Sequence, residues 1–283
     1  MPYPLQEKYI NLLTDFGFKR VFGTEPNKNL LIDFLNTLLP EHHHIQDVTF
    51  KNNENLGNTQ IDRKAIFDIY CQAKSGEYFI VEIQKAKQNY FKDRSVYYST
   101  FPIQEQAEKG QWNYKLTPVY TVGVLDFVFD DHKNEETIVH TVELKDQDCE
   151  VFYDKLKFIY LELPKFKKKV EELETHFDKW LYIFRHLSKL QTRPKKLQEK
   201  VFQQLFEAAE IANFSQNERQ AYHESLKHYI DIKNVVDTSK EEGREEGREE
   251  RANEIAKILK NRGMTIQEIV EITGLSTDEI EKL

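Results

Sequence analysis

Two short apolar segments, residues 65–72 and 78–84, constrain the fold of this chain more than any other feature. Both are rich in isoleucine and aromatic residues, and both have the length of a strand that is buried in a sheet. The connection between them contains Lys74, Ser75 and Gly76, and a short connection with glycine predicts a tight turn. The sequence therefore predicts a β-hairpin.

The spacing of apolar residues elsewhere predicts helices on both sides of a set of strands. Residues 9–23 and 30–39 have helical spacing, and Pro40 is expected to end the second helix. The other predicted elements are strands near residues 48–50, 118–129, 137–144 and 156–163, a helix at 91–108, and helices after Pro164. This order predicts an α/β core with a helical C-terminal extension.

We expect three parts along the chain: a core of residues 1–165, a helical extension of residues 166–239, and a tail of residues 240–283. The tail begins with the charged near-repeat EEGREEGREER. Two matches to the S/T-x-x-E capping box, which begin at Thr265 and Ser276, predict two short helices after it. The second of these helices is acidic and would repel DNA phosphate, so the tail is expected to mediate self-association or another protein contact.

Composition narrows the class of protein further. The formal net charge is −8, which argues against a chain that coats nucleic acid over its whole surface. Residues 165–200 nevertheless contain eleven Lys or Arg against five acids, which predicts either a basic flank or a solvated helix face. We find no apolar run long enough to cross a membrane and no signal peptide, so a cytoplasmic location is expected.

The spacing of cysteines and histidines does not predict a structural metal site. Cys71 and Cys149 are far apart and outside any CxxC motif, and each is expected to be a small buried residue. Three consecutive histidines, His42–His44, are expected to lie in a surface turn, because neighbours in a regular element cannot all face one metal ion.

Carboxylates interrupt both strands of the predicted hairpin. Asp68 lies within the first apolar segment and Glu82 within the second, and a buried carboxylate costs stability unless it is paired or binds a cation. Glu82 and Gln84 are two residues apart in a strand, so their side chains leave the same face of the sheet. The register of the hairpin decides whether Asp68 joins them. The pattern therefore fits either a divalent-cation site or a half-exposed sheet with all three side chains in water.

The hairpin segment, residues 66–86, reads IFDIYCQAKSGEYFIVEIQKA. It resembles the signature of the PD-(D/E)XK nucleases, in which an acid on one strand is followed by a strand that carries E-x-K or a variant. TDFGFKRVFG at 14–23, DRSVYYSTF at 93–101 and KLKFIYLELPKF at 155–166 resemble parts of the recombination-promoting nuclease family of transposases in that superfamily. The resemblance spans about residues 8–200 and implies a restriction-endonuclease-like mixed sheet core flanked by helices.

The resemblance also implies roles for the matching residues of the hairpin. Asp68 would be the first metal ligand and Glu82 the second, with the backbone carbonyl of Ile83 as a third donor. Gln84 stands where the signature has lysine, so it would hydrogen-bond the attacking water but could not supply positive charge. The implied metal is Mg²⁺, with Mn²⁺ or Ca²⁺ as alternatives.

Residues outside the two strands match the family pattern as well. Asp15 would approach the metal from the first helix, Lys19 would reach a DNA phosphate, and Arg94 would clamp the scissile phosphate through its planar guanidinium. Helix capping and surface pairing explain Asp15 and Lys19 equally well, and pairing with a nearby acid explains Arg94. Lys85 and Lys87 would contact the substrate backbone or lie in water.

The sequence thus supports two hypotheses from different classes. The first is a Mg²⁺-dependent DNA endonuclease, linked to recombination or mobile elements, with Asp68, Glu82 and Gln84 as the catalytic set. The second is a DNA-binding or accessory protein that keeps the nuclease fold with weak or absent cleavage, which Gln84 and the acidic net charge favour. RNA as the substrate and a homodimer formed through the C-terminal helices are further alternatives.

Overall fold

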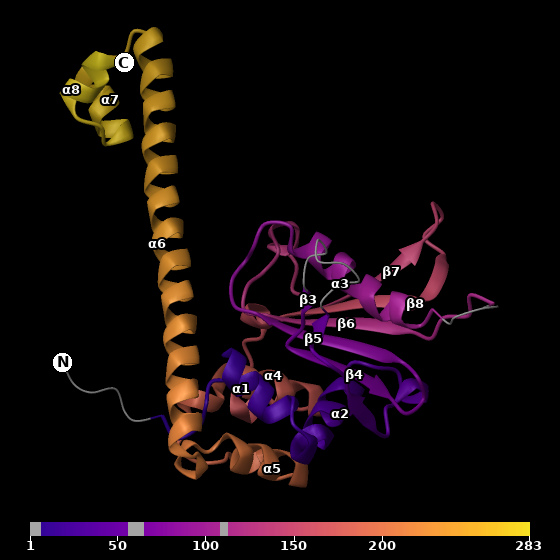
Figure 1. Cartoon of the computed structure of the whole chain (residues 1–283). Coiled ribbons are helices and arrows are strands. Elements are labelled where there is room, and N and C mark those ends of the chain that lie inside the picture. Colours follow the sequence, from indigo (N-terminus) through magenta and orange to yellow (C-terminus); the bar gives the residue numbers. More distant parts are fainter. Residues whose placement is uncertain (1–6, 56–64, 108–112) are drawn as a thin grey trace. The chain divides into compact units, whose positions relative to one another are not determined.

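A computed structural model describes residues 7–55, 65–107 and 113–283 (Figure 1). The strands are β1 (Val48–Phe50), β2 (Glu54–Asn55), β3 (Ala65–Ile66), β4 (Ile69–Ala73), β5 (Tyr78–Gln84), β6 (Val119–Leu125), β7 (Val139–Lys145) and β8 (Val151–Glu162). The helices are α1 (Asp15–Phe22), α2 (Lys28–Asn36), α3 (Phe91–Glu105), α4 (His176–His186), α5 (Lys200–Ala209), α6 (Gln216–Asn261), α7 (Ile266–Thr273) and α8 (Thr277–Lys282). The chain forms two compact units, one up to Tyr229 and one from Ile230 to Leu283. The boundaries expected after residues 165 and 239 stay predictions.

The first unit is built on a six-stranded mixed sheet with the strand order β1-β4-β5-β6-β8-β7. The pairs β5–β6 and β6–β8 are parallel, and the pairs β1–β4, β4–β5 and β7–β8 are antiparallel. The predicted hairpin is confirmed, because Ile69 of β4 lies opposite Val81 of β5 and the strands are joined through Gly76 at a φ of 113°. Helices flank this sheet, so the structure has a restriction-endonuclease-like α/β fold.

Helices α1, α2 and α4 lie on one side of the sheet and α3 on the other (Figure 1). Phe79, Val81 and Ile83 of β5 belong to the large core formed with α1, α2, α4 and α5. Ile80 of the same strand belongs to a second core that includes Phe101 of α3. Because strand side chains alternate between faces, the side chain of Glu82 leaves the sheet on the α3 side.

Helix α1 begins at Asp15, six residues later than its apolar spacing predicts. Tyr9 forms an isolated bridge with Glu210, and the side chain of Thr14 caps the helix by accepting a hydrogen bond from the Gly17 N–H. Gly17 is required here, because a Cβ on this residue would lie 2.2 Å from the Asn11 carbonyl oxygen. This cap places Asp15 in the first turn of the helix.

The strand predicted at residues 65–72 is divided in two. β3 ends at Ile66 and β4 begins at Ile69. Between them the Phe67 N–H donates to the Asn53 carbonyl, and the Asp68 N–H donates to the Glu82 carboxylate instead of to a strand carbonyl. The Glu82 carboxylate thus accepts the hydrogen bond that a strand carbonyl would otherwise accept from the Asp68 N–H. The strand is therefore interrupted at Asp68.

Several smaller predictions have mixed outcomes. The histidines 42–44 are exposed beside a short 3-10 turn and Cys71 is buried, both as predicted. Cys149 is exposed in the β7–β8 turn, so its predicted burial is wrong. β8 begins at Val151 rather than near residue 156, because its first residues pair with β7 in an exposed ribbon that has no buried pattern in the sequence. The expected end of the helix at Glu108 lies outside the described residues.

The second unit contains the two short helices that the capping boxes predict. Thr265 and Ser276 each accept from the N–H three residues later, and Gly274 ends α7 with a φ of 74°. Four residues form its small core: Ala256, Ile269, Leu275 and Ile280. Among the described residues, no helix combines the length and the apolar character that a membrane span needs.

Candidate functional site

The two carboxylates of the hairpin come together in the structure. The Asp68 N–H donates to Oε1 of Glu82 at 3.2 Å, and the Ile83 N–H donates to Oδ2 of Asp68 at 2.9 Å. The Asp68 side chain is only 16 % exposed, and Gln84 is buried. The register therefore places both carboxylates at one end of the hairpin, and the arrangement with all three polar side chains in water does not occur.

Burial disfavours the ionised form of both carboxylates. Desolvation raises the pKa of Asp68 above its ordinary value, although the Ile83 N–H and the nearby Lys19 oppose that rise. Desolvation and the repulsion from Asp68 raise the pKa of Glu82 to about 8. A cation placed between the two groups would reverse both effects, because an opposite charge favours the ionised carboxylate.

Gln84, at the lysine position of the signature, is held by both ends of its amide. Its Oε1 accepts from Nη2 of Arg94 at 2.5 Å, and its Nε2 donates to the Ala86 carbonyl at 3.0 Å. Arg94 also donates through Nη1 to Gln88, and its guanidinium lies 5.8 Å from the centre of the Tyr98 ring. The favourable charge of Arg94 lowers the pKa of Glu82, against the larger effect of burial. Arg94 thus brings a fixed positive charge to the site from α3.

Helix α1 contributes one acid and one cation to the same place. Nζ of Lys19 lies 3.8 Å from Oδ1 of Asp68, and the negative charge of Asp15 raises the pKa of Asp68. Asp15 pairs with Nζ of Lys85 at 3.0 Å. Lys85 is 8 % exposed, so the alternative that it lies in water is wrong, and its contact with the substrate stays a prediction. Its partner comes from a distant helix, which the local sequence does not reveal.

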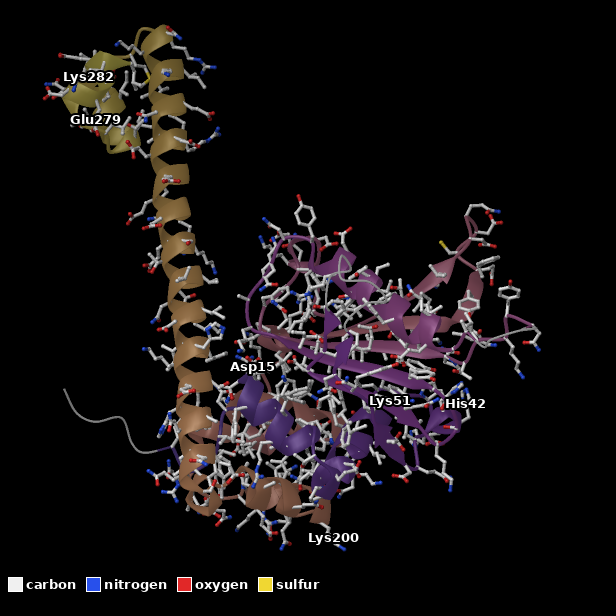
Figure 2. The ribbon with its side chains drawn as sticks, in the orientation of Figure 1. Asp15, His42, Lys51, Lys200, Glu279 and Lys282 are labelled. Atoms are coloured by element: carbon white, nitrogen blue, oxygen red, sulfur yellow. The ribbon has the colours of Figure 1, made fainter. Side chains whose placement is uncertain are left out.

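A hollow of about 450 Å³ is lined in part by Lys19 and by Phe67 and Ile69, the residues that precede and follow Asp68 in the chain. Its lining consists of Lys19, Gly23, Phe50, Lys51, Asn52, Asn53, Ile66, Phe67 and Ile69. Two lysines and two asparagines supply hydrogen-bond donors of the kind that phosphate oxygens accept. His42 and Asp15 lie on opposite sides of the first unit (Figure 2).

Several cations of the basic segment at residues 165–200 are paired with acids or main-chain carbonyls. Lys165 pairs with Glu162, Lys168 with Asp178, and Lys179 with Glu199. Arg185 donates to three main-chain carbonyls, those of Leu163, Pro164 and Phe166. These four cations have partners within the first unit, and the choice between a basic flank and a solvated helix face stays a prediction.

Comparison with known proteins identifies the family. No curated protein and no solved structure matches the chain. The sequence profile described as PD-(D/E)XK nuclease family transposase matches residues 12–239, which is most of the chain and includes every site residue named above. The chain therefore belongs to the PD-(D/E)XK nuclease family of transposases, which indicates a nuclease-type function.

Proposed function

We propose that this protein is a metal-dependent DNA endonuclease that hydrolyses phosphodiester bonds. The observation that carries the proposal is the pair of hydrogen bonds that joins Asp68 to the Glu82 strand, because it holds two partly buried carboxylates near each other beside the sheet. Two neighbouring carboxylates that are largely removed from water are costly to ionise unless a cation lies between them. The family name supports a link to recombination or mobile elements.

The donor set of this site fits Mg²⁺. Asp68 and Glu82 would supply carboxylate oxygens and Ile83 its main-chain carbonyl, and oxygen ligands of this kind suit Mg²⁺, with Mn²⁺ or Ca²⁺ as substitutes. Asp15 would be an additional donor if Lys85 released it. When bound, the ion would neutralise charge on the reacting phosphate and lower the pKa of an attacking water.

The neighbouring residues would position the substrate. Arg94 would clamp the scissile phosphate through its planar guanidinium. Gln84 holds Arg94 through Oε1, and a second lone pair on that oxygen would accept a hydrogen bond from the attacking water. In this proposal Gln84 and Arg94 together replace the signature lysine, with the amide orienting water and the guanidinium supplying positive charge. Lys19 would contact a phosphate next to the scissile one.

A plasmid-nicking assay with Mg²⁺, Mn²⁺ or chelator tests the proposal. We expect cleavage with either metal, none with chelator, and a loss of about 1000-fold or more in Asp68→Ala and Glu82→Ala, because each variant removes a metal ligand. Glu143→Ala is the matched control, since Glu143 is a carboxylate of the same sheet that pairs with Lys157 away from the site. Its cleavage rate should equal that of the wild type.

The alternative is a DNA-binding or accessory protein with little or no cleavage, which the replacement of the signature lysine by Gln84 favours. Absence of nicking with every metal, together with salt-sensitive DNA binding, would support this alternative and refute the endonuclease. Parallel reactions on single-stranded RNA separate the third reading, because cleavage confined to RNA would refute DNA as the substrate.

Self-association through the C-terminal unit is a separate proposal. α8 carries Asp278, Glu279 and Glu281, which argues against insertion into a DNA groove. Ile258 and Ile272 of the same unit are each more than half exposed. Sedimentation should show a larger assembly for the full chain than for a chain that ends at Ser239; equal oligomeric states would remove the proposal.

A further inference from the structure

A second group of titratable side chains surrounds Glu162 at the end of β8. The Glu162 side chain is fully buried. Its Oε1 lies 3.2 Å from Nδ1 of His132, and its Oε2 lies 3.1 Å from Nε2 of His140. His132 ends a 3-10 turn (Asp130–His132), and His140 lies on β7.

Glu162 also has two contacts that do not involve the histidines. Nζ of Lys165 lies 2.6 Å from its Oε2, and the Phe129 N–H donates to its Oε1 at 2.7 Å. Each imidazole has one ring nitrogen at Glu162, and Nε2 of His140 lies 3.1 Å from the Thr137 carbonyl as well. A neutral imidazole that donates from one nitrogen presents a lone pair on the other.

The second ring nitrogen of His140 has a carboxylate near it. The rings of His132 and His140 are stacked face to face, with their centres 3.9 Å apart. An oxygen of Glu135 lies 4.0 Å from Nδ1 of His140. One ligand atom from each of His132, Glu135 and His140 lies within 4.8 Å of the others.

We propose that His132, Glu135 and His140 form a zinc site, in which Glu162 orients the two histidines. Metal-bound histidines usually donate their other ring N–H to a carboxylate, which is the relation of both imidazoles to Glu162. Two histidines and one glutamate are a ligand set typical of zinc with a fourth position for water or substrate. Ligands of tetrahedral zinc are roughly 3.3 Å apart. Closing the site would therefore need a movement of Glu135, whose side chain is half exposed, and a turn of the stacked imidazoles so that one nitrogen of each faces the ion.

This site is distinct from the proposed nuclease centre and prefers a different ion. Mg²⁺ favours oxygen ligands, whereas imidazole nitrogen favours zinc and other transition metals. Gln84, Leu125 and Glu162 are register partners at the C-terminal ends of β5, β6 and β8. Both sites therefore lie near the same end of these strands. Bound zinc would fasten the residues after β6 to the first residues of β7.

Zinc titration of the full-length chain tests the proposal. We expect one Zn²⁺ per chain at roughly micromolar affinity or tighter, and a visible absorption band when Co²⁺ replaces zinc. His132→Gln should abolish the band, and Glu135→Gln should weaken zinc binding about tenfold or more. The double variant Asp68→Ala/Glu82→Ala should keep the band, which separates this site from the nuclease centre whether or not the chain cleaves DNA.

The exposed histidines 42–44 provide the matched control, because neighbouring imidazoles at a surface also attract zinc. Replacing all three by glutamine should leave the Co²⁺ band and the tight Zn²⁺ site unchanged. Loss of binding in this triple variant, retention of binding in Glu135→Gln at wild-type affinity, or no zinc binding by the wild type would each overturn the proposal. Glu135→Gln changes an exposed side chain, so it decides the outcome even if His132→Gln fails to fold.

Discussion

Glu82 and Glu162 are carboxylates on the same sheet, but their surroundings have opposite electrostatic effects. Glu82 lies against Asp68, and burial with this repulsion raises its pKa. Glu162 is more deeply buried, yet Lys165 and the Phe129 N–H lower its pKa. The comparison shows that burial alone does not identify a cation site in this protein. At the proposed nuclease centre, burial and the repulsion from Asp68 outweigh the charges of Arg94 and Lys19, whereas at Glu162 the direct contacts outweigh burial.

The largest expected effect is on stability, in Glu162→Ala. This change leaves the buried ammonium of Lys165 without its carboxylate, and breaking a buried ion pair on one side costs about 3 kcal/mol or more. Glu82→Ala should cost far less, because it removes a repulsion along with its hydrogen bond. Urea unfolding in chelator measures both variants.

The double variant Glu162→Ala/Lys165→Met checks the cause. It should recover part of the lost free energy of unfolding, because neither charge is then left alone. Equal losses in Glu82→Ala and Glu162→Ala would show that the two carboxylates have similar surroundings and would end the comparison.

The next effect concerns Arg94, the cation that α3 brings to the proposed nuclease centre. Arg94→Ala should slow DNA cleavage about 100-fold, which corresponds to about 2.7 kcal/mol of transition-state stabilisation. Arg94→Lys should recover only part of the rate, because an ammonium lacks the planar fork that contacts both Gln84 and Gln88. Single-turnover rates with saturating Mg²⁺ are the measurement.

Lys92→Ala is the control for this change, since Lys92 lies on the same helix and pairs with Asp131 at the surface. Its rate should stay within about threefold of the wild type, as expected for an exposed ion pair. If Arg94→Ala cleaves as fast as Lys92→Ala, the guanidinium does not replace the signature lysine.

The sequence predicted the local features of the Asp68–Glu82 site but not the contacts that tertiary packing makes there. The hairpin, its turn and the shared face of Glu82 and Gln84 follow from a period of two and a glycine. The contact of Asp68 with Glu82 depends on register, which no single strand encodes. The pairing of Lys85 with Asp15 joins a strand end to a distant helix, so neither residue signals it locally.

The group around Glu162 was missed for a related reason. The segment from His132 to His140 has the metal-ligand residue types, but its spacing matches no regular helix or strand motif. Glu162 interrupts an apolar strand in the way that Asp68 and Glu82 do. The rule that singled out Asp68 and Glu82 would also have marked Glu162 as a candidate site residue. Only the structure shows that Lys165 lies beside it.

A pH series sharpens the comparison further. In metal-free protein the raised pKa of Glu82 means that the folded state binds a proton that the unfolded state releases above its ordinary value of 4.5. The free energy of unfolding should therefore fall as the pH rises toward about 8, by about 2 kcal/mol between pH 6 and 8. Glu82→Gln should remove this slope, and saturating Mg²⁺ should flatten it in the wild type.

Glu162 should behave in the opposite way. Its lowered pKa contributes stability that is present above the ordinary value of 4.5 and is lost as the pH falls below it. Urea unfolding in chelator from pH 4 to pH 9 separates the two windows. Parallel curves for the wild type and Glu82→Gln between pH 6 and 8 would show that Glu82 is ionised there without a cation.

The smallest expected effect comes from Lys19, which is 45 % exposed and 3.8 Å from Asp68. An exposed ion pair contributes about 0.5 kcal/mol, so Lys19→Gln should change stability little. The same change should tighten Mg²⁺ binding about twofold in the absence of DNA, because Lys19 and the metal compete for one carboxylate. Isothermal titration of both proteins with Mg²⁺ measures this difference. A weaker Mg²⁺ affinity in Lys19→Gln would mean that the lysine orders Asp68 for the metal rather than competing with it, and the nuclease centre would then resemble the Glu162 site more closely than we propose.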